Sequence, residues 1–246
     1  MSKLNIEDLI RIVKESENIV FFGGAGVSTE SDIPDFRSES GIYSIENKYG
    51  YPPEFLLSHT FFKTHDDEFF KFYKETMIYP DAKPNKAHKA LAILEDMGKL
   101  KAVITQNIDG LHQKSGSQNV IEIHGSVHKN YCIKCGQKYD LNYIIQSNGV
   151  PKCEKCSSLV RPDVVLYEEG LDMSVLNSAI EAIVKAEVLV VGGTSLNVYP
   201  AAGLVEYFRG KYLVLINKSQ TQYDKRAQIV IRDSIGEVLD KVVRSI

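Results

Sequence analysis

The four cysteines of this chain form two pairs, and their spacing restricts the fold more than any other feature of the sequence. Cys132 and Cys135 make one Cys-x-x-Cys knuckle, and Cys153 and Cys156 make a second one after 17 intervening residues. This spacing is typical of a zinc ribbon, in which four thiolates hold Zn²⁺ tetrahedrally at about 2.3 Å. Two disulfides or two thioredoxin-like redox pairs are the alternatives. No histidine or acid nearby offers an open-site ligand, so we expect one structural zinc ion per chain.

Composition narrows the class of protein further. The chain has 246 residues, 43% of them hydrophobic, and a net charge of −3, which suits one large domain or one domain with a smaller insertion. Its N-terminus has no apolar signal-peptide core and no run approaches the roughly 18 apolar residues of a membrane helix, so we expect a cytoplasmic protein that does not enter membranes. That compartment disfavours disulfides. The slightly acidic balance disfavours nucleic-acid binding.

Apolar runs alternate with helical patterns along most of the chain. A helix with Asn5 as N-cap is predicted over residues 5–16, and a second helix is predicted to begin at Pro84 and to end at Gly98. Another helical stretch covers residues 201–208. Continuous apolar runs predict strands over residues 19–22, 102–105, 120–123, 188–192 and 213–217. This alternation predicts an α/β fold with a doubly wound, parallel, Rossmann-like sheet.

Two regions interrupt this alternation. Residues 39–82 are rich in Phe and Tyr and predict an irregular helical insertion, and residues 127–163 hold the cysteines. We expect a single catalytic domain over residues 1–246, in which the insertion and the zinc-binding module pack into a smaller domain. The Rossmann core would then comprise residues 1–38, 83–126 and 164–246.

A glycine-rich turn and a polar loop follow the first strand. Gly24, Ala25 and Gly26 would let backbone N–H groups approach a pyrophosphate, although a purely structural tight turn is the alternative. The loop beyond it contains Phe36 and Arg37, which could shield a reactive ring and face a phosphate. A surface loop with an Asp–Arg pair is the simpler interpretation of that segment.

Polar side chains also follow two later strands. Gln106, Asn107 and Asp109 leave the carboxyl end of one strand, where doubly wound sheets bind their ligands, and His124 leaves the end of another. A lone histidine is more often structural than catalytic, but the neighbouring polar residues favour a catalytic one.

Together these motifs resemble the sirtuin family of NAD-dependent protein lysine deacylases, and the compact bacterial members most closely. The matches occur in the family's order over nearly the whole chain. They are residues 24–28, 33–37 and 105–109, His124 and Gly125, the four cysteines, residues 193–196 and Asn217.

The resemblance implies a reaction and a set of catalytic residues. NAD would be a co-substrate, and the acetyl-lysine oxygen would displace nicotinamide to give an alkylimidate. His124 would then act as general base on a ribose hydroxyl, and the products would be free lysine and O-acetyl-ADP-ribose. Its ordinary pKa near 6.5 allows a neutral fraction at physiological pH. Asn107 and Asp109 would line the nicotinamide pocket.

The resemblance also implies the residues that bind the two substrates and the metal. The cofactor-binding set is Gly24, Ala25, Gly26, Ser28, Thr29, Ile33, Asp35, Phe36, Arg37, Gln106, Asn107, Ile108, Asp109, His124, Gly193, Thr194, Ser195, Asn217 and Asp233. The substrate-binding set is Val165, Tyr167, Glu168, Leu196, Asn197 and Val198. Cys132, Cys135, Cys153 and Cys156 would hold the zinc ion.

Several positions depart from the family pattern. Asp32 and Glu168 stand where the family commonly has glycine, and Gly23 stands where threonine is common. Glu168 would put a negative charge beside the substrate, so we expect a preference for peptides rich in Lys and Arg. Phe70 and Tyr73 occupy the positions where succinyl- and malonyl-specific sirtuins carry Tyr and Arg. Without that cation we expect acetyl or longer neutral acyl groups to be preferred.

Three other functions remain as alternatives. A mono-ADP-ribosyltransferase on the same scaffold is disfavoured by His124, which such enzymes tend to lack. A zinc-ribbon binding module fused to an inert nucleotide-sensing domain is disfavoured by Asn107, Asp109 and His124 together. A nicotinamide dehydrogenase would need neither these three residues nor the zinc knuckles. From the family we expect acetyl-lysine proteins as partners and a monomeric enzyme.

Overall fold

A six-stranded parallel sheet forms the larger part of the molecule. The computed structural model describes residues 4–35 and 49–246. The strand order is β3-β2-β1-β7-β8-β9, and every neighbouring pair is parallel. This order confirms the predicted doubly wound sheet. The strands are β1 (Ile19–Gly23), β2 (Leu100–Thr105), β3 (Val120–Glu122), β7 (Val188–Gly192), β8 (Tyr212–Ile216) and β9 (Ile229–Ile231).

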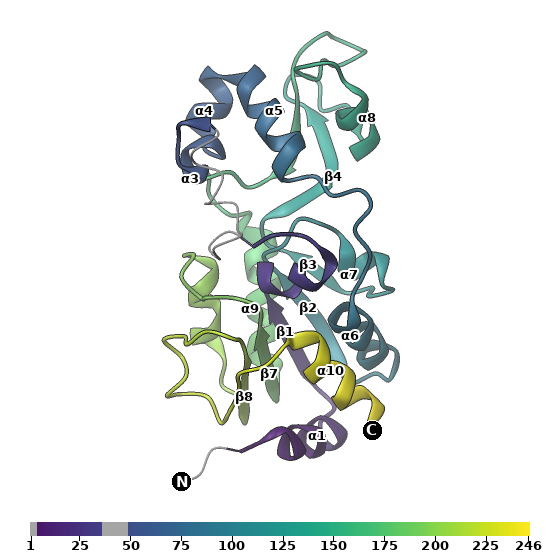
Figure 1. Ribbon diagram of the computed structural model, residues 1–246, viewed down its shortest axis with the longest axis vertical. Coiled ribbons are helices and arrows are strands. Elements are labelled where there is room, and N and C mark those ends of the chain that lie inside the picture. The colour runs from purple at the N-terminus through teal and green to yellow at the C-terminus, as the bar shows by residue number, and fades with distance from the viewer. Residues whose placement is uncertain (1–3, 36–48) are drawn as a thin grey trace.

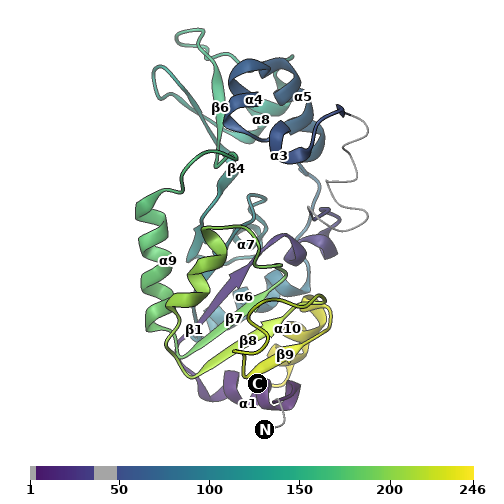
Figure 2. The same ribbon diagram turned by 90° about the vertical axis from the view of Figure 1, so that its left-hand side faces the viewer.

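Helices cover both faces of this sheet, as Figure 2 shows. On one face, α1 (Ile6–Glu15), α6 (Lys86–Asp96) and α10 (Ile235–Arg244) share an apolar core with the strands. On the other face, α9 (Met173–Lys185) and the 3₁₀ helix η4 (Ala201–Tyr207) build a second core. Burial on both sides explains why the central strands β1 and β7 consist almost entirely of apolar residues and end in glycine.

Local sequence signals explain where the first helices begin. The side chain of Asn5 accepts hydrogen bonds from the backbone of Glu7 and Asp8, which confirms it as the N-cap of α1. The predicted start of α6 at Pro84 is wrong by two residues. Asn85 is its N-cap and accepts from the N–H groups of Ala87 and His88, because a side-chain acceptor satisfies two helix-end donors that a proline leaves open.

A small module lies beyond the carboxyl ends of the parallel strands (Figure 1). Its antiparallel sheet has the order β5-β4-β6, with β4 (Gly125–Cys132), β5 (Lys138–Tyr139) and β6 (Val160–Val164). Among residues 49–246, four helices pack with it around an apolar core rich in phenylalanine, which includes Phe61, Phe62, Phe69, Phe70 and Phe72. These helices are α3 (Pro53–Leu56), α4 (His59–Thr64), α5 (Asp66–Thr76) and α8 (Leu141–Gln146).

The remaining elements are short helical turns. The segment after β1 forms two three-residue 3₁₀ turns, η1 (Ala25–Val27) and η2 (Thr29–Ser31), and α7 (Leu111–Lys114) follows β2. The expected helix over residues 201–208 is 3₁₀ in form. Within the described residues, no helix has the length and apolar character needed to cross a membrane.

Candidate active site

The site is assembled where the parallel strands end and the small module begins. β1 lies between β2 and β7, so the chain leaves β1 at the point where the strand order reverses. In doubly wound sheets this reversal opens a crevice at the carboxyl ends of the strands, where ligands bind. Most of the polar residues singled out in the sequence follow β1, β2, β3 or β7 at this edge.

The glycine turn after β1 packs directly on the turn after β7. The N–H of Gly26 donates to the carbonyl of Gly193 at 2.8 Å. A Cβ added to Gly26 would lie 2.9 Å from the Cα of Gly193, and one added to Gly193, whose φ is +60°, would lie 2.4 Å from the backbone N of Val27. Both glycines are therefore required by this contact between backbones. This packing alone is enough to require glycine in the turn, whether or not the turn also binds a cofactor.

Ser28 connects Asn107 and Asp109 in one polar cluster. Its hydroxyl donates to Asp109 Oδ2 at 2.7 Å and accepts from Asn107 Nδ2 at 3.0 Å. The N–H of Leu111 donates to the second carboxylate oxygen at 2.9 Å. Burial raises the pKa of Asp109, while the hydrogen bonds from Leu111 and Ser28 lower it and offset part of that rise. The sequence-predicted residues Ser28, Asn107 and Asp109 thus meet in one partly buried network.

A second contact joins the ends of β2 and β7. The side-chain amide of Gln106 donates to Thr194 Oγ1 at 3.0 Å, and the N–H of Leu196 donates to the same oxygen at 3.2 Å. Thr194 and Leu196 are both buried. The backbone after β7 is thereby tied to the strand that carries Asn107 and Asp109.

His124 follows β3, and its hydrogen-bond partner determines which ring nitrogen carries the proton. Nδ1 lies 3.0 Å from the carbonyl oxygen of Gln106. Since a carbonyl can only accept, Nδ1 carries the proton in the neutral ring and Nε2 is the basic nitrogen. Burial lowers the pKa of His124, and the bond to Gln106 offsets part of that effect. A neutral imidazole with a defined basic nitrogen is the form that a general base requires.

The segment 165–169 after β6 links His124 to the small module. The N–H of Val165 donates to the carbonyl of His124 at 3.0 Å. Two residues later, Tyr167 pairs with the start of α4: its N–H donates to Leu57 and its carbonyl accepts from the N–H of His59, at 3.0 and 2.9 Å. The sequence-predicted substrate residues Val165, Tyr167 and Glu168 therefore lie on a strand-like bridge between the two parts of the molecule.

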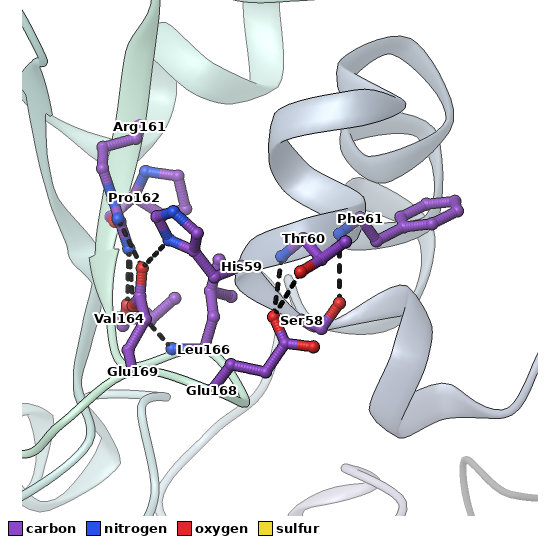
Figure 3. Close-up of polar contacts among 10 residues, drawn as sticks. All are labelled: Ser58, His59, Thr60, Phe61, Arg161, Pro162, Val164, Leu166, Glu168 and Glu169. Atoms are coloured by element: carbon purple, nitrogen blue, oxygen red, sulfur yellow. Dashed lines mark hydrogen bonds and ion pairs between the residues drawn. The ribbon is translucent and has the colours of Figure 1, made fainter.

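Figure 3 shows a charged cluster next to this bridge that the sequence analysis missed. Arg161 donates to both carboxylate oxygens of Glu169, at 2.8 and 3.0 Å, and His59 Nδ1 lies 2.8 Å from Glu169 Oε1. Partial burial alone would raise the pKa of Glu169, but hydrogen bonds from Arg161, His59 and the N–H of Leu166 lower it to about 2. Because His59 is 110 residues from Glu169, no local pattern could have indicated this cluster.

A second residue missed at the sequence level is His128 on β4. Its Nε2 lies 3.0 Å from the carbonyl oxygen of Asp109, which ties the loop after β2 to the small module. The N–H of Val127 donates to the carbonyl of Ile108 at 3.0 Å beside it. A histidine between Val127 and Lys129 gives no sequence signal for such a contact.

The other predicted site residues make different contacts. Asn217 follows β8 and donates to the carbonyl of Ser219, and Asp233 follows β9 and accepts from the N–H of Ser234. Thr29 and Asn197 are exposed, and Ile33, Asp35, Ser195 and Val198 are half-buried. Phe36 and Arg37 lie outside the described residues.

The four cysteines gather at the far end of β4 and β6. Their Sγ atoms all lie within 4.8 Å of one another, and the shortest separations are 3.4 Å between Cys132 and Cys156 and 3.6 Å between Cys135 and Cys153. A disulfide needs about 2.05 Å. A tetrahedron of zinc–sulfur bonds of about 2.3 Å places its sulfurs about 3.8 Å apart, so the cluster fits a structural Zn²⁺.

Comparisons with known proteins agree with this geometry. The Sir2 family model matches residues 24–200. The NAD-dependent protein deacetylase of Clostridium acetobutylicum is 62% identical, over 97% of this chain and 98% of the relative, and that of Clostridium perfringens has the same identity and coverage.

Solved structures give the same result. A Sir2 complex with deacetylated p53 peptide and 3'-O-acetyl ADP-ribose has a TM-score of 0.87 and 40% identity, over 98% of both chains. A complex of a Sir2 homologue with NAD has the same TM-score and identity, over 97% of this chain and 92% of that one. The chain belongs to the Sir2 family.

Proposed function

We propose that this protein is an NAD-dependent protein lysine deacetylase. It converts NAD and an acetyl-lysine protein to nicotinamide, O-acetyl-ADP-ribose and free lysine. The observation that carries the proposal is the half-buried His124, whose Nδ1–H is held by the carbonyl of Gln106 and whose basic Nε2 serves as general base. Relatives of the same name at 62% identity over nearly the whole chain support it.

The polar cluster around Ser28 is proposed as the nicotinamide pocket. When NAD is bound, it supplies a glycosidic bond with a good leaving group. Asn107 and Asp109 each hold a fixed orientation through Ser28, so their polar groups are organised before the carboxamide arrives. The turns at Gly24–Gly26 and Gly193–Ser195 are the proposed phosphate contacts. Asn217 and Asp233 are proposed on the adenosine side.

Segment 165–169 and the turn at Leu196–Val198 are proposed as the two walls of the acyl-lysine site. The hydrogen bond from Val165 to the carbonyl of His124 supports this assignment, because it brings the segment beside the proposed base. Phe70 and Tyr73 are fully buried among aromatic side chains, which supports a neutral acyl pocket. We therefore propose acetyl and longer neutral acyl groups as substrates.

The charge near this segment supports a preference for basic substrates. The carboxylate of Glu169 is paired with Arg161, whereas the exposed carboxylate of Glu168 accepts hydrogen bonds from neutral groups of Thr60. Turnover of acetyl-peptides flanked by Lys or Arg should exceed that of acidic peptides at low salt, and Glu168→Gln should reduce the difference. Equal turnover of both peptides would contradict this preference.

We further propose a cytoplasmic monomer built as one catalytic domain, with a structural zinc ion in the small module. The reducing cytoplasm keeps the four cysteines available as thiolates for the metal. The ion would be held by Cys132, Cys135, Cys153 and Cys156 and would join the strands β4 and β6 to the loop between them.

Product mass spectrometry after mixing the protein, NAD and an acetyl-lysine peptide tests the proposed reaction. Equal amounts of nicotinamide, O-acetyl-ADP-ribose and deacetylated peptide are expected. ADP-ribose attached to protein, with the peptide still acetylated, would instead identify a transferase. Binding of NAD without cleavage in the presence of several acyl-peptides would identify a sensing module.

A further inference from the structure

Glu168 has an unusual backbone conformation. Its φ is +74°, in the left-handed region that glycine adopts freely and that residues with a Cβ enter only at an energetic cost. It stands where the family commonly has glycine. The chain therefore adopts a glycine-like turn here although the residue is glutamate. Such a conformation persists only where the surroundings stabilise it.

The side chain of Glu168 supplies that stabilisation. Its Oε2 accepts hydrogen bonds from the N–H of Thr60 at 2.9 Å and from the hydroxyl of Thr60 at 2.7 Å. These donors belong to the first turn of α4, where Ser58 Oγ accepts from the N–H of Phe61 at 3.0 Å (Figure 3). Glu168 and Ser58 therefore satisfy two free donors at the same helix end, although 110 residues separate them in sequence.

The backbone beside Glu168 is fixed to the same helix end. Tyr167 exchanges two hydrogen bonds with Leu57 and His59, and Glu169 contacts His59 and Arg161. Glu168 lies between these two anchored residues and is exposed, so it is the part of the bridge that a substrate peptide would meet. If the carboxylate were removed and a Cβ remained, the turn would still have its unfavourable φ but would lose the hydrogen bonds to Thr60 that stabilise it.

We propose that Glu168 is a positioning residue for substrate binding: its carboxylate caps α4 and holds segment 165–169 in the shape that receives the acyl-lysine peptide. This inference rests on the proposed function. A segment that is ordered before the peptide arrives loses less conformational freedom on binding. The contact between Glu168 and Thr60, called the anchor below, should therefore increase the affinity for peptide. The proposed NAD contacts at Gly24–Gly26 and Gly193–Ser195 follow β1 and β7, so we expect NAD affinity not to depend on this anchor.

Four variants separate the anchor from the charge and from the backbone conformation. Thr60→Val removes the hydroxyl donor and keeps the charge of Glu168. Glu168→Gln removes the charge and keeps an oxygen that accepts from Thr60. Glu168→Ala removes the anchor and keeps the unfavourable φ, whereas Glu168→Gly removes the anchor and relieves the φ. Glu181→Ala on the exposed face of α9 is the matched control.

Steady-state kinetics with an uncharged acetyl-peptide, together with melting temperatures, provide the test. For Thr60→Val, Glu168→Ala and Glu168→Gly, we expect the KM for peptide to rise about three- to tenfold, with the KM for NAD and kcat within twofold of wild type. Glu168→Gln, which keeps an oxygen that accepts from Thr60, should raise the KM for peptide less than Glu168→Ala does. Glu181→Ala should stay within twofold for all three constants. Glu168→Ala combined with Thr60→Val should show no further rise in KM, because both act on one contact.

Three results would overturn the inference. If the peptide KM is unchanged in Glu168→Gly but raised in Glu168→Ala, peptide binding depends only on the positive φ at this position and not on the contact with Thr60. Peptide and NAD constants that rise together with a lower melting temperature would mean a general loss of structure. A peptide KM that is unchanged in Thr60→Val and Glu168→Ala would exclude the anchor. If the wild-type protein cleaves no NAD in the presence of acetyl-peptide, the proposed function itself is overturned. This outcome is seen with wild type alone, so it is distinct from the three results above.

Discussion

His124 illustrates how one backbone contact can prepare a side chain for catalysis. The carbonyl of Gln106 accepts only from Nδ1–H, so the same bond fixes the orientation of the ring and leaves Nε2 basic. The sequence indicated that His124 and Gln106 belong to one site. It could not show that the backbone of Gln106, and not its side chain, contacts the imidazole, because that contact depends on the register of β2 against β3.

The pKa of His124 leads to a prediction about pH dependence. Burial lowers this pKa from its ordinary value, so the ring stays neutral to a lower pH than a free histidine. Since the neutral ring is the active form, the acidic limb of kcat should be centred below pH 6.5, the ordinary pKa of histidine. A plot of kcat against pH with saturating NAD and peptide provides the measurement. An acidic limb centred above pH 7 would contradict this assignment.

Ser28 is the residue through which Asn107 and Asp109 are held. Ser28→Ala removes one hydroxyl that serves both partners and leaves the buried Asp109 short of a donor. We expect nicotinamide release to fall at least tenfold and the free energy of unfolding to fall by about 1–3 kcal/mol. Ser178→Ala, which removes an exposed hydroxyl on α9, is the control and should change neither quantity. Nicotinamide release within twofold of wild type in Ser28→Ala would contradict this role.

At the scale of secondary structure, the sequence predicted best the elements with a simple burial pattern. The five predicted strands correspond to β1, β2, β3, β7 and β8. Four of them are largely buried on both faces and are therefore continuous apolar runs, whereas β3 is a half-buried edge strand. The helices α9 and α10 and the strand β9 were not predicted. In α10 the signal was available, since Ile235, Val238, Leu239 and Val242 follow helical spacing and are buried.

The conformations of Asp32 and Glu168 show the limit of such patterns. Both positions have a positive φ, of 61° and 74°. At each, a residue with a Cβ stands where the family commonly has glycine, and the structure has a left-handed conformation there. For Glu168 the reason is a contact with a helix end 108 residues away, and only the tertiary structure reveals it.

The zinc site provides a prediction at the scale of one element. The cysteines connect the ends of β4 and β6 with the intervening loop, so metal removal should unfold that sheet first. The purified protein should contain one zinc per chain by elemental analysis. Cys153→Ser should lose the zinc and lower the melting temperature by several degrees. Activity should fall with zinc loss although the cysteines make no contact with His124. Full activity of a zinc-free protein would contradict a structural role.

At the scale of the whole molecule, contacts between distant segments join the two parts of the chain. Arg161, Glu169 and His59 connect β6, the bridge after it and α4, while His128 connects β4 to the loop after β2. The sequence predicted that the two insertions form one small module, and they share one apolar core. It could not predict the polar contacts that orient this module, because each depends on two segments meeting in space.

A buried pair of histidines beneath the site makes stability depend on pH. His88 and His112 lie with ring centroids 4.7 Å apart, and neither nitrogen of His112 has a partner within the described parts of the chain. Burial lowers the pKa of His88 to about 4, and burial together with the nearby His88 lowers that of His112 to about 3. The unfolded chain therefore takes up protons below pH 6.5 that the folded protein does not.

This difference should lower the stability of the enzyme in mild acid. The free energy of unfolding should fall by about 2 kcal/mol per histidine between pH 7.5 and pH 5. Urea unfolding at both pH values measures it. His112→Leu should lose less stability over this range than wild type, whereas His65→Gln, at an exposed position, should lose as much. Loss of zinc in acid affects all three proteins alike. An identical fall in wild type and His112→Leu would contradict the prediction.

The most direct test of the account compares wild type with His124→Ala in a single product measurement. Both proteins are mixed with NAD and an acetyl-lysine peptide, and nicotinamide, O-acetyl-ADP-ribose and free peptide are quantified by mass spectrometry. Wild type should form the three products in equal amounts. His124→Ala should keep its melting temperature and its binding of NAD and form less than about one hundredth of the deacetylated peptide, since a general base contributes about 10²–10⁴-fold. Deacetylation by His124→Ala at a rate near that of wild type would contradict the central claim.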